Sequence, residues 1–501
     1  MIATCKEKLN AFFQTDLFLV IYGAEALICW ILGWDIVHCT LTAALGCLIF
    51  LTCEDLRPFL GLVCVFITGM STRQLGTAGF NVALGVLIPL LVLSFGYYAY
   101  RNWYKKGVAL KPGKLWLGIA MAGGVAVLSG LFCPEYNHWL MFAVLGASAG
   151  LYFYYFLMIN ATGSDLKKLL GSALFITSAV ALLEMFWHYF TSGDISAAMQ
   201  DKVFHGYATT NNVAVFFCMA VPLCLYRAVK SRRGWLYVLW GLALLAGVFL
   251  TRSRGCLLVL GILLPFMYVI AVVRSPRKMQ LLLPVLCFLA VAGICIGIFW
   301  DSFYELYEKM FELGLSDNGR YEHYRQAIEF FLRHPLFGVG YVGTEEPSSM
   351  YFGIYMFHNT FFQLLACSGI VGVLGSVLYY VQRYRMLLKK ISLFKLFALF
   401  AVLAFDGYGM IDVTQITPYL IFFVFLALAA CERETDPETL FRRSRAAAGE
   451  QLVRAPIAGE TEEPADSASF SEDPASVPSE TEEAKEPDPG GESAGPQQEG
   501  G

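Results

Sequence analysis

The sequence predicts an all-α integral membrane protein, a polytopic helical bundle, and three observations support this fold class. Hydrophobic residues make up 57% of the chain and charged residues only 15%, which is unlike an ordinary water-soluble domain. Apolar runs long enough to cross a bilayer recur from Leu17 to Cys431. Helices satisfy their backbone hydrogen bonds internally, as lipid requires. We therefore expect about 12 to 14 spans, several of them short.

The amino-terminal region, residues 1–200, is predicted to consist of membrane spans. Nothing before Leu17 resembles a cleavable signal peptide, so the first span is expected to remain as an anchor. Most of the 14 cysteines lie inside apolar runs, where they behave as small hydrophobic residues. Their spacing contains no CxxC pair and therefore predicts neither a disulfide framework nor a zinc site.

Lysine and arginine are distributed unevenly between alternate loops, and this asymmetry predicts the orientation. One set of loops carries 22 basic residues. The opposite set carries eight, namely Arg73, Lys202, Arg252, Arg254, Lys309, Arg320, Arg325 and Arg333. Basic loops favour the cytoplasmic side. We therefore expect a multi-pass protein of the cytoplasmic membrane, with both termini cytoplasmic and residues 301–357 forming one large extracytoplasmic helical loop.

The carboxy-terminal segment, residues 432–501, differs in composition from the rest of the chain. Residues 456–501 contain 13 acidic residues and one lysine, so 27 acidic and 35 basic residues remain for the preceding part. The segment is also rich in proline and poor in bulky apolar residues, so it cannot bury a core. We expect a disordered, acidic, cytoplasmic tail.

The large loop is predicted to contain its own amphipathic helix. Residues 316–319, with the sequence Ser-Asp-Asn-Gly, are typical of a helix start with a capping side chain. Tyr321, Tyr324, Ile328 and Phe331 then recur at helical spacing and predict an apolar face. His334 followed by proline predicts the end of the helix. A polar loop of this length between spans is typical of a functional site.

Two arginines form a compact pair in a very short turn on the predicted outer face. If the turn from 251 to 255 is extended, Arg252 and Arg254 point the same way. Two planar guanidinium groups at the membrane surface suit a diphosphate or another anionic headgroup. The alternative is that both side chains reach up to lipid phosphates as interfacial anchors.

Two further candidates lie at helix starts. Arg320 opens the loop helix, where a cation opposes the helix dipole at a cost of about 0.3–1 kcal/mol. This placement indicates an anionic ligand or, alternatively, a salt bridge to Glu322 or Glu305. His358 opens the next span, where a neutral imidazole would suit a general base. An interfacial or capping role for His358 is the simpler alternative.

Some chemistries lack their usual residues in this sequence. The predicted outer loops contain no D-x-D pair and no carboxylate–histidine cluster with metal spacing, and the chain contains no Walker loop. We therefore expect no metal at the site, no cofactor, no ATP and no nucleic-acid partner. A reaction here would need a substrate that is already activated.

Short motifs follow one another in a defined order between residues 200 and 380. They are Gly206 with Asn211-Asn212 before a span, the turn Ser253-Arg254-Gly255, Gly319-Arg320 opening a helix, the segment from Pro335 to Gly340, and His358-Asn359 followed by Gly369-Ile-Val-Gly372. In this order and spacing they resemble the O-antigen ligase and O-antigen polymerase family. These are membrane glycosyltransferases that use undecaprenyl-diphosphate-linked glycans. The resemblance defines a domain over residues 201–431.

The resemblance implies a GT-C-like architecture and a metal-independent, inverting glycosyl transfer in surface polysaccharide biosynthesis. The donor would be an undecaprenyl-diphosphate-linked oligosaccharide and the acceptor a glycan or a lipid-linked molecule, with the prenyl chain held among membrane lipid. His358 would be the base. Arg254 and Arg320 would stabilise the departing diphosphate. The substrate-binding candidates are Arg252, Arg325, Asn359 and Asn211.

Other functions are compatible with the same hydropathy pattern. A lipid-linked glycan flippase or polysaccharide exporter would need a charged central cavity, and Glu25, Glu184 and Asp406 lie within apolar runs. A polymerase of the shape, elongation and division type would rely on a loop carboxylate instead. A non-catalytic scaffold would not need a structured polar loop. The sequence leaves ligase and polymerase undistinguished.

Overall fold

The structure is a computed structural model, and its described residues belong to one compact unit. The chain divides into Met1–Ser444 and Arg445–Gly501. Described are residues 2–71, 73–74, 77–129, 138–161, 163, 165–193, 204–205, 208–298, 300–301, 304, 308, 319–342, 350–351, 354–415 and 417–434. Apart from residues 432–434, the predicted acidic tail at 432–501 lies outside these ranges.

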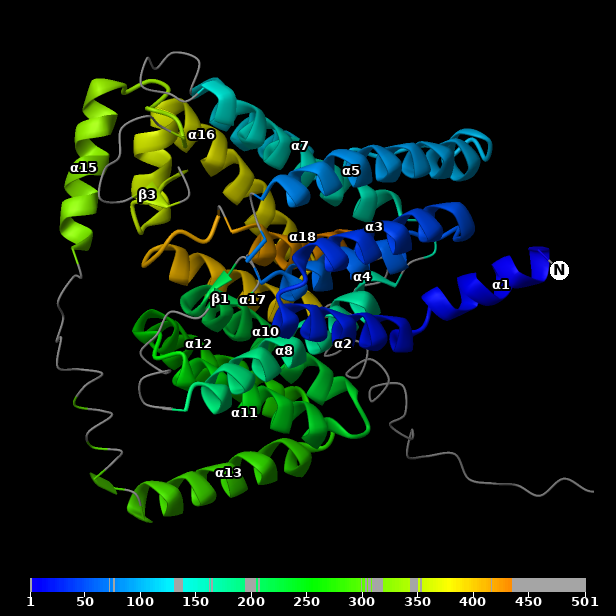
Figure 1. Cartoon of the computed structure of the whole chain (residues 1–501). Helices are drawn as coiled ribbons and strands as arrows, with labels where there is room; N and C mark the ends of the chain where they lie inside the picture. Colours follow the sequence, from blue (N-terminus) through cyan, green and yellow to red (C-terminus); the bar gives the residue numbers. More distant parts are fainter. Residues whose placement is uncertain are drawn as a thin grey trace, which may run out of the picture. The chain divides into compact units, whose positions relative to one another are not determined.

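The predicted all-α membrane fold is confirmed (Figure 1). Among the described residues, extended structure is confined to two short antiparallel hairpins. The first pairs β1 (Phe204–His205) with β2 (Ala208–Thr209), and the second pairs β3 (Met350–Tyr351) with β4 (Ile354–Tyr355). Both hairpins lie in connections between helices rather than in a layer of their own.

The amino-terminal region forms a series of apolar helices. Thr15 caps the second helix through its hydroxyl, and Gly33 ends that helix in the left-handed conformation. The elements are α1 (Ile2–Phe13), α2 (Asp16–Leu32), α3 (Asp35–Thr52), α4 (Arg57–Phe66), η1 (Ile67–Gly69), α5 (Ala78–Ala99), η2 (Tyr100–Tyr104), α6 (Trp116–Leu128), α7 (His138–Asn160) and α8 (Leu166–Thr191).

The carboxy-terminal half is built around one central helix. The elements are α10 (Thr210–Lys230), α11 (Gly234–Leu250), α12 (Arg254–Arg274), α13 (Lys278–Ile298), α15 (Arg320–Arg333), α16 (Thr360–Leu388), α17 (Leu393–Gly409) and α18 (Pro418–Glu432). Helix α10 is apolar all round and buried over most of its length, as expected for a core helix. It packs against α11, α12 and α17, so these helices share a core.

The apolar helices include both long and short segments, as the sequence predicts. Within the described ranges, seven helices are long and apolar enough to cross a membrane, and the bent pair Lys6–Phe13 and Asp16–Leu32 would make an eighth. Four further apolar helices are shorter, namely Arg57–Gly69, Trp116–Leu128, Gly234–Leu250 and Leu420–Glu432. The sequence prediction of about 12 to 14 spans, several of them short, includes segments of this kind.

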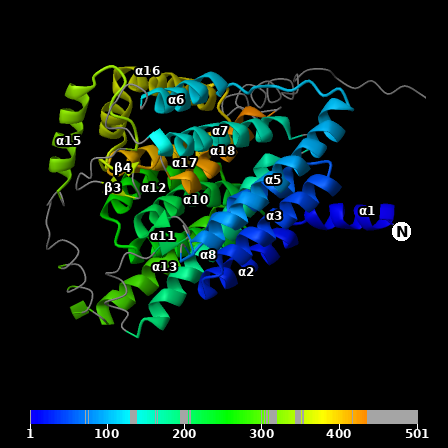
Figure 2. The ribbon, with the colours of Figure 1, turned by 45° about the horizontal axis from the view of Figure 1, so that its top comes forward.

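Helix α15 lies at one end of the bundle, beside the start of α16 and the hairpin of β3 and β4 (Figures 1 and 2). Its buried residues Ala327 and Phe330 pack with Tyr355 and Phe357 in a small separate core. The predicted loop helix is therefore present, and its own hydrophobic contacts hold it on the connection that leads into α16.

Candidate active site

Helix α15 begins and ends close to the predicted positions, and its expected apolar face is buried in part. It starts after Gly319, which has a positive φ and provides no side-chain cap, and it ends at Arg333 before His334. Of the four residues of the expected apolar face, Tyr324 and Phe331 are partly buried, whereas Tyr321 is 74% exposed and Ile328 is also exposed. The buried side chains are Ala327 and Phe330.

The glycine-rich segment after α15 docks into a break in α16. Gly369 interrupts the helical backbone with φ 60° and ψ −163°. Amides of the docked segment then bond the freed carbonyls, Val339 N to Ala366 O at 2.9 Å and Gly340 N to Cys367 O at 3.0 Å. In return, Ile370 N donates to Pro335 O at 2.9 Å and Val371 N to Leu336 O at 3.1 Å.

Glycine is required on both sides of this contact. A Cβ at Gly338 would lie 2.4 Å from the carbonyl carbon of Cys367, and one at Gly369 would lie 2.5 Å from that of Leu336. Both glycines also have positive φ, 73° and 60°. The two glycine motifs of the sequence are therefore halves of one joint, which fixes α15 relative to the start of α16.

The turn before α16 is fixed by Asn359. Its Oδ1 accepts hydrogen bonds from the amides of Phe361 and Phe362, which caps the helix. Its Nδ2 donates to Met410 O at 2.7 Å, just beyond α17. One side chain therefore starts α16 and ties it to the turn that follows α17. This role is structural, and the substrate contact expected from the sequence stays a prediction.

His358 lies next to a carboxylate that the sequence analysis missed. Its Nδ1 is 3.0 Å from Asp412 Oδ1, and the Asp412 oxygen also accepts from the amide of Val413 at 2.8 Å. The imidazole is 36% exposed and the carboxylate 15%. His358 also has a positive φ of 50°, which is unusual for a residue other than glycine. The turn thus directs Nδ1 of His358 to Asp412 and leaves part of the imidazole exposed.

Asp412 could have been suspected from its position. It lies between the last two apolar runs, and the charge asymmetry assigns that turn to the same face as His358. Single acidic residues at span ends are common, however, and the 54 positions between the two partners give no spacing signal.

Arg320 faces the same region from α15. Its guanidinium interacts electrostatically with Tyr324 and with Tyr408 of α17, and Asp412 also interacts with both tyrosines. Burial raises the pKa of Tyr324, and the charge of Arg320 acts in the opposite direction. Tyr324 stacks on Phe362 with ring centroids 4.5 Å apart. Arg320 and Asp412 are therefore grouped around the same pair of tyrosines, and His358 adjoins them through Asp412 and Tyr324.

The arginine turn between α11 and α12 borders the same region but is not extended. Arg252 has a left-handed backbone with φ 54°, and Arg254 is already the first residue of α12. The argument that they point the same way because the turn is extended is therefore wrong. A Cβ on Gly255 would lie 2.9 Å from Tyr408 and 3.0 Å from Ile411, so the turn packs beside Asp412. Arg252 interacts electrostatically with Tyr189 of α8.

The remaining predicted binding residues, Arg325 and Asn211, have no contact with His358 among those described. Arg325 is 69% exposed and pairs within α15 with Glu322 at 2.8 Å and Glu329 at 3.7 Å, although an apolar edge was expected. Asn211 lies in the first turn of α10 and is partly exposed. Gly206, which belongs to the same motif, lies outside the described residues.

The intramembrane acids that an exporter would need do not meet in one cavity. Glu25 bonds His38 between α2 and α3. Asp406 of α17 bonds Arg383 and Tyr384 of α16. Glu184 is buried in α8. Arg383 is buried and lies over the rings of Tyr379, Tyr380 and Tyr384. Asp406 therefore has a local partner from a neighbouring helix, and Glu25 does too.

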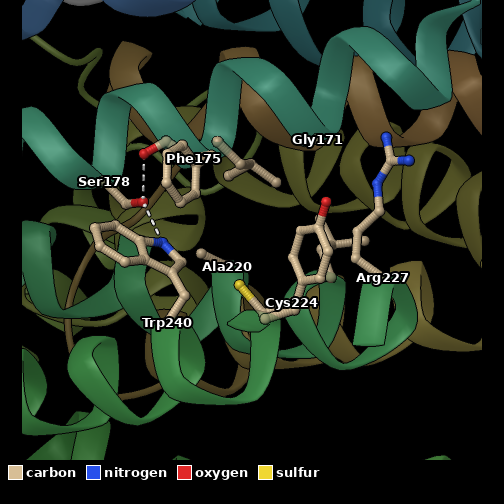
Figure 3. A pocket seen from close by; sticks show the side chains of 10 residues that line it. Gly171, Phe175, Ser178, Ala220, Cys224, Arg227 and Trp240 are labelled. Atoms are coloured by element: carbon tan, nitrogen blue, oxygen red, sulfur yellow. Dashed lines mark hydrogen bonds between the residues drawn. The ribbon is translucent and has the colours of Figure 1, made fainter. Parts of the chain in front are cut away.

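A small crevice elsewhere in the bundle is apolar and unlike a site for a charged substrate. Figure 3 shows it between α8, α10 and α11, lined by groups such as Phe175, Cys224 and Trp240. The indole of Trp240 donates to Ser178 Oγ at 3.2 Å. Arg227 closes one end and donates to Lys167 O at 2.8 Å. These polar groups bond within the protein, so the crevice is a packing feature.

Comparison with known families agrees with the geometry. Residues 238–377 match the family model described as O-antigen ligase, which supports the O-antigen ligase and polymerase family for this chain. The match supports a membrane enzyme in surface polysaccharide biosynthesis. Comparison with curated proteins gives no match. The matched region contains Arg254, Arg320 and His358, whereas Asp412 and Asn211 lie outside it.

Proposed function

We propose that this protein is a glycosyltransferase that transfers or polymerises an undecaprenyl-diphosphate-linked glycan at the outer face of the cytoplasmic membrane. The observation that carries the proposal is the pair of His358 and Asp412, with an open imidazole beside a sheltered carboxylate. The family match and the apolar helices support the same class of enzyme. Both termini would be cytoplasmic.

His358 would act as the general base. Asp412 accepts a hydrogen bond from Nδ1–H, so the neutral ring keeps its lone pair on Nε2. Nε2 takes the proton of the acceptor hydroxyl as the new bond forms between that oxygen and the anomeric carbon. The bond from the anomeric carbon to the diphosphate oxygen breaks, and its electron pair leaves with the diphosphate. Attack from the face opposite the leaving group inverts the anomeric configuration.

Arginines would stabilise the departing diphosphate without a metal ion at the reacting centre. Arg320 is the first candidate, because it shares the tyrosine pair with Asp412. Arg254 is the second, since its turn packs beside the residue that precedes Asp412. Preorganised cations aimed at developing negative charge supply a large part of the rate enhancement of such reactions. Arg252 and Asn211 would bind more distant parts of the substrate.

The decisive experiment supplies the purified chain with undecaprenyl-diphosphate oligosaccharide, without ATP and without added metal, and resolves the products by size. A ladder of products identifies a polymerase. A single transfer that requires an added lipid or glycan acceptor identifies a ligase. No glycosidic product, together with transfer of the lipid across vesicles, would overturn the proposal and support a flippase.

A matched set of variants tests the site itself. His358→Ala should lower turnover about 10²–10⁴-fold, the usual contribution of a general base. Lys106→Ala, which removes only an exposed ion pair with Glu54, should leave turnover unchanged. Equal turnover in the two variants would refute the assignment of His358.

A further inference from the structure

A second polar cluster lies within the amino-terminal helices, away from His358. Glu25 and Cys29 of α2 are four residues apart and therefore share one helix face. His38 of α3 meets them from the neighbouring helix. One ligand atom from each of the three residues lies within 4.8 Å of the others, and His38 and Cys29 are buried. We propose that Glu25, Cys29 and His38 form a divalent transition-metal site that joins α2 to α3, with zinc as the preferred ion.

The distances between the ligand atoms fit a single ion. His38 Nδ1 lies 3.0 Å from Glu25 Oε2, and Cys29 Sγ lies 3.1 Å from Glu25 Oε1. Zinc bonds of about 2.0–2.3 Å in a tetrahedron place neighbouring ligand atoms about 3.3–3.8 Å apart. Both pairs are therefore within about 1 Å of the spacing around a metal, and all three ligand atoms lie within 4.8 Å of one another.

The imidazole is oriented as a metal ligand is. Its second nitrogen, Nε2, donates to the carbonyl oxygen of Phe66 at 2.8 Å, so Nδ1 is the atom turned toward Glu25. Metal-binding histidines typically donate their other ring nitrogen to a carbonyl or a carboxylate. The ring is also stacked between Tyr22 and Phe66, with interplanar angles of 16° and 8°.

A glycine makes room for this ring. A Cβ on Gly69, at the end of η1, would lie 2.4 Å from His38 Nε2. Helices α2, α3 and α4 and the η1 turn pack together around the cluster. The imidazole position is therefore fixed by a hydrogen bond to Phe66, by the rings of Tyr22 and Phe66, and by the close backbone of Gly69.

The charges and ligand types select the ion. A thiolate, a carboxylate and a neutral imidazole sum to two negative charges, which a divalent cation neutralises in a region where unpaired charge is costly. Sulfur, nitrogen and oxygen together suit zinc better than magnesium or calcium. Glu25 is 23% exposed, whereas Cys29 and His38 are buried. Three protein ligands leave the fourth position to water.

This inference is independent of the proposed glycosyl transfer, and its test does not measure activity. The full-length chain is purified with an affinity tag that lacks histidine and is titrated with Co²⁺ alone, then with Zn²⁺. We expect one Co²⁺ per chain, a thiolate-to-cobalt charge-transfer band, and displacement of Co²⁺ by Zn²⁺. Cys29→Ser should abolish the band and weaken metal binding at least about tenfold.

The matched control is Cys47→Ser, which removes a thiol from α3 outside the cluster and should preserve the band. Glu25→Gln provides a second variant, because the amide keeps hydrogen-bonding capacity but loses the charge. It should weaken metal binding in a protein that still elutes as a single species. No Co²⁺ bound by the unmodified chain, or equal spectra for Cys29→Ser and Cys47→Ser, would reduce the cluster to a hydrogen-bonded triad and overturn the proposal.

Discussion

The Nδ1 atom of His358 lies 3.0 Å from Oδ1 of Asp412, although 54 residues separate the two along the chain. His358 comes from the turn before α16 and Asp412 from the turn after α17. Asn359 links the same two turns through its bond to Met410. The pair is therefore a product of tertiary packing, and one of its members lies beyond the region matched by the family model.

Asp412→Asn should keep the fold but impair proton transfer. The amide can donate to Nδ1, which would favour the tautomer with its proton on Nε2 and remove the base from the acceptor side. We expect kcat to fall about 10²–10⁴-fold with little change in KM. Steady-state kinetics on the lipid-linked donor provide the measurement. A KM effect alone would indicate that Asp412 binds substrate and does not orient His358.

Arg320 and Arg325 lie on one helix and provide an internal comparison. Arg320→Gln should lower kcat about 10²–10³-fold, because it removes charge stabilisation from the leaving diphosphate. Arg325→Gln removes only exposed ion pairs to Glu322 and Glu329 and should retain most activity. Turnover of both variants, measured under identical conditions, shows which of the two arginines contributes to catalysis. A larger loss in Arg325→Gln would return that residue to the substrate-binding group.

Gly338 should be far less tolerant of substitution than Gly319, although both have positive φ. Gly338→Ala would press a Cβ against the backbone of Cys367 at 2.4 Å. Among the described residues, a Cβ on Gly319 meets nothing within 4 Å, so Gly319→Ala should cost only about 1 kcal/mol. Thermal unfolding in detergent measures both variants. Similar melting temperatures would show that the joint between α15 and α16 is not as tight as described.

The buried pair of Arg383 and Asp406 should be strongly coupled. Arg383→Leu strands a carboxylate between helices and should destabilise the protein by about 3–5 kcal/mol. The double variant Arg383→Leu, Asp406→Leu removes both charges and should recover part of that loss. Unfolding free energies for the two single variants and the double variant give the coupling. Additive losses would mean that the two side chains stabilise the fold independently.

Periodicity and charge predicted the parts of the fold that depend on local sequence. The membrane class, the loop helix near residues 320–333 and its end at His334 all follow from apolar spacing and from proline. The residues that pack α15 against the rest of the protein were predicted only in part, because Tyr321 and Ile328 are apolar yet exposed, while Ala327 is small and buried. The apolar residues of a helix identify its buried face only when the surface that it packs against is known.

The candidate site was predicted in part, and the remainder depends on tertiary contacts. His358 and Arg320 could be suggested because motif order and helix position single them out. The carboxylate of Asp412 beside His358 could not be predicted, and neither could the bonds between the Pro335–Gly340 segment and the residues around Gly369. Both join parts of the chain that share no periodic pattern. For the cluster in α2, the spacing of Glu25 and Cys29 was visible in the sequence, but the approach of His38 was not.

Under the proposed function, the joint between the Pro335–Gly340 segment and α16 has a consequence for how a saccharide chain could approach His358. Four main-chain hydrogen bonds, made without any side chain, hold the segment that follows α15 against α16, the helix that begins after His358. Separating this segment from α16 would break all four bonds. A saccharide substrate of the proposed reaction would therefore meet a fixed surface at this position, whose shape is set by backbone hydrogen bonds and not by a closing lid.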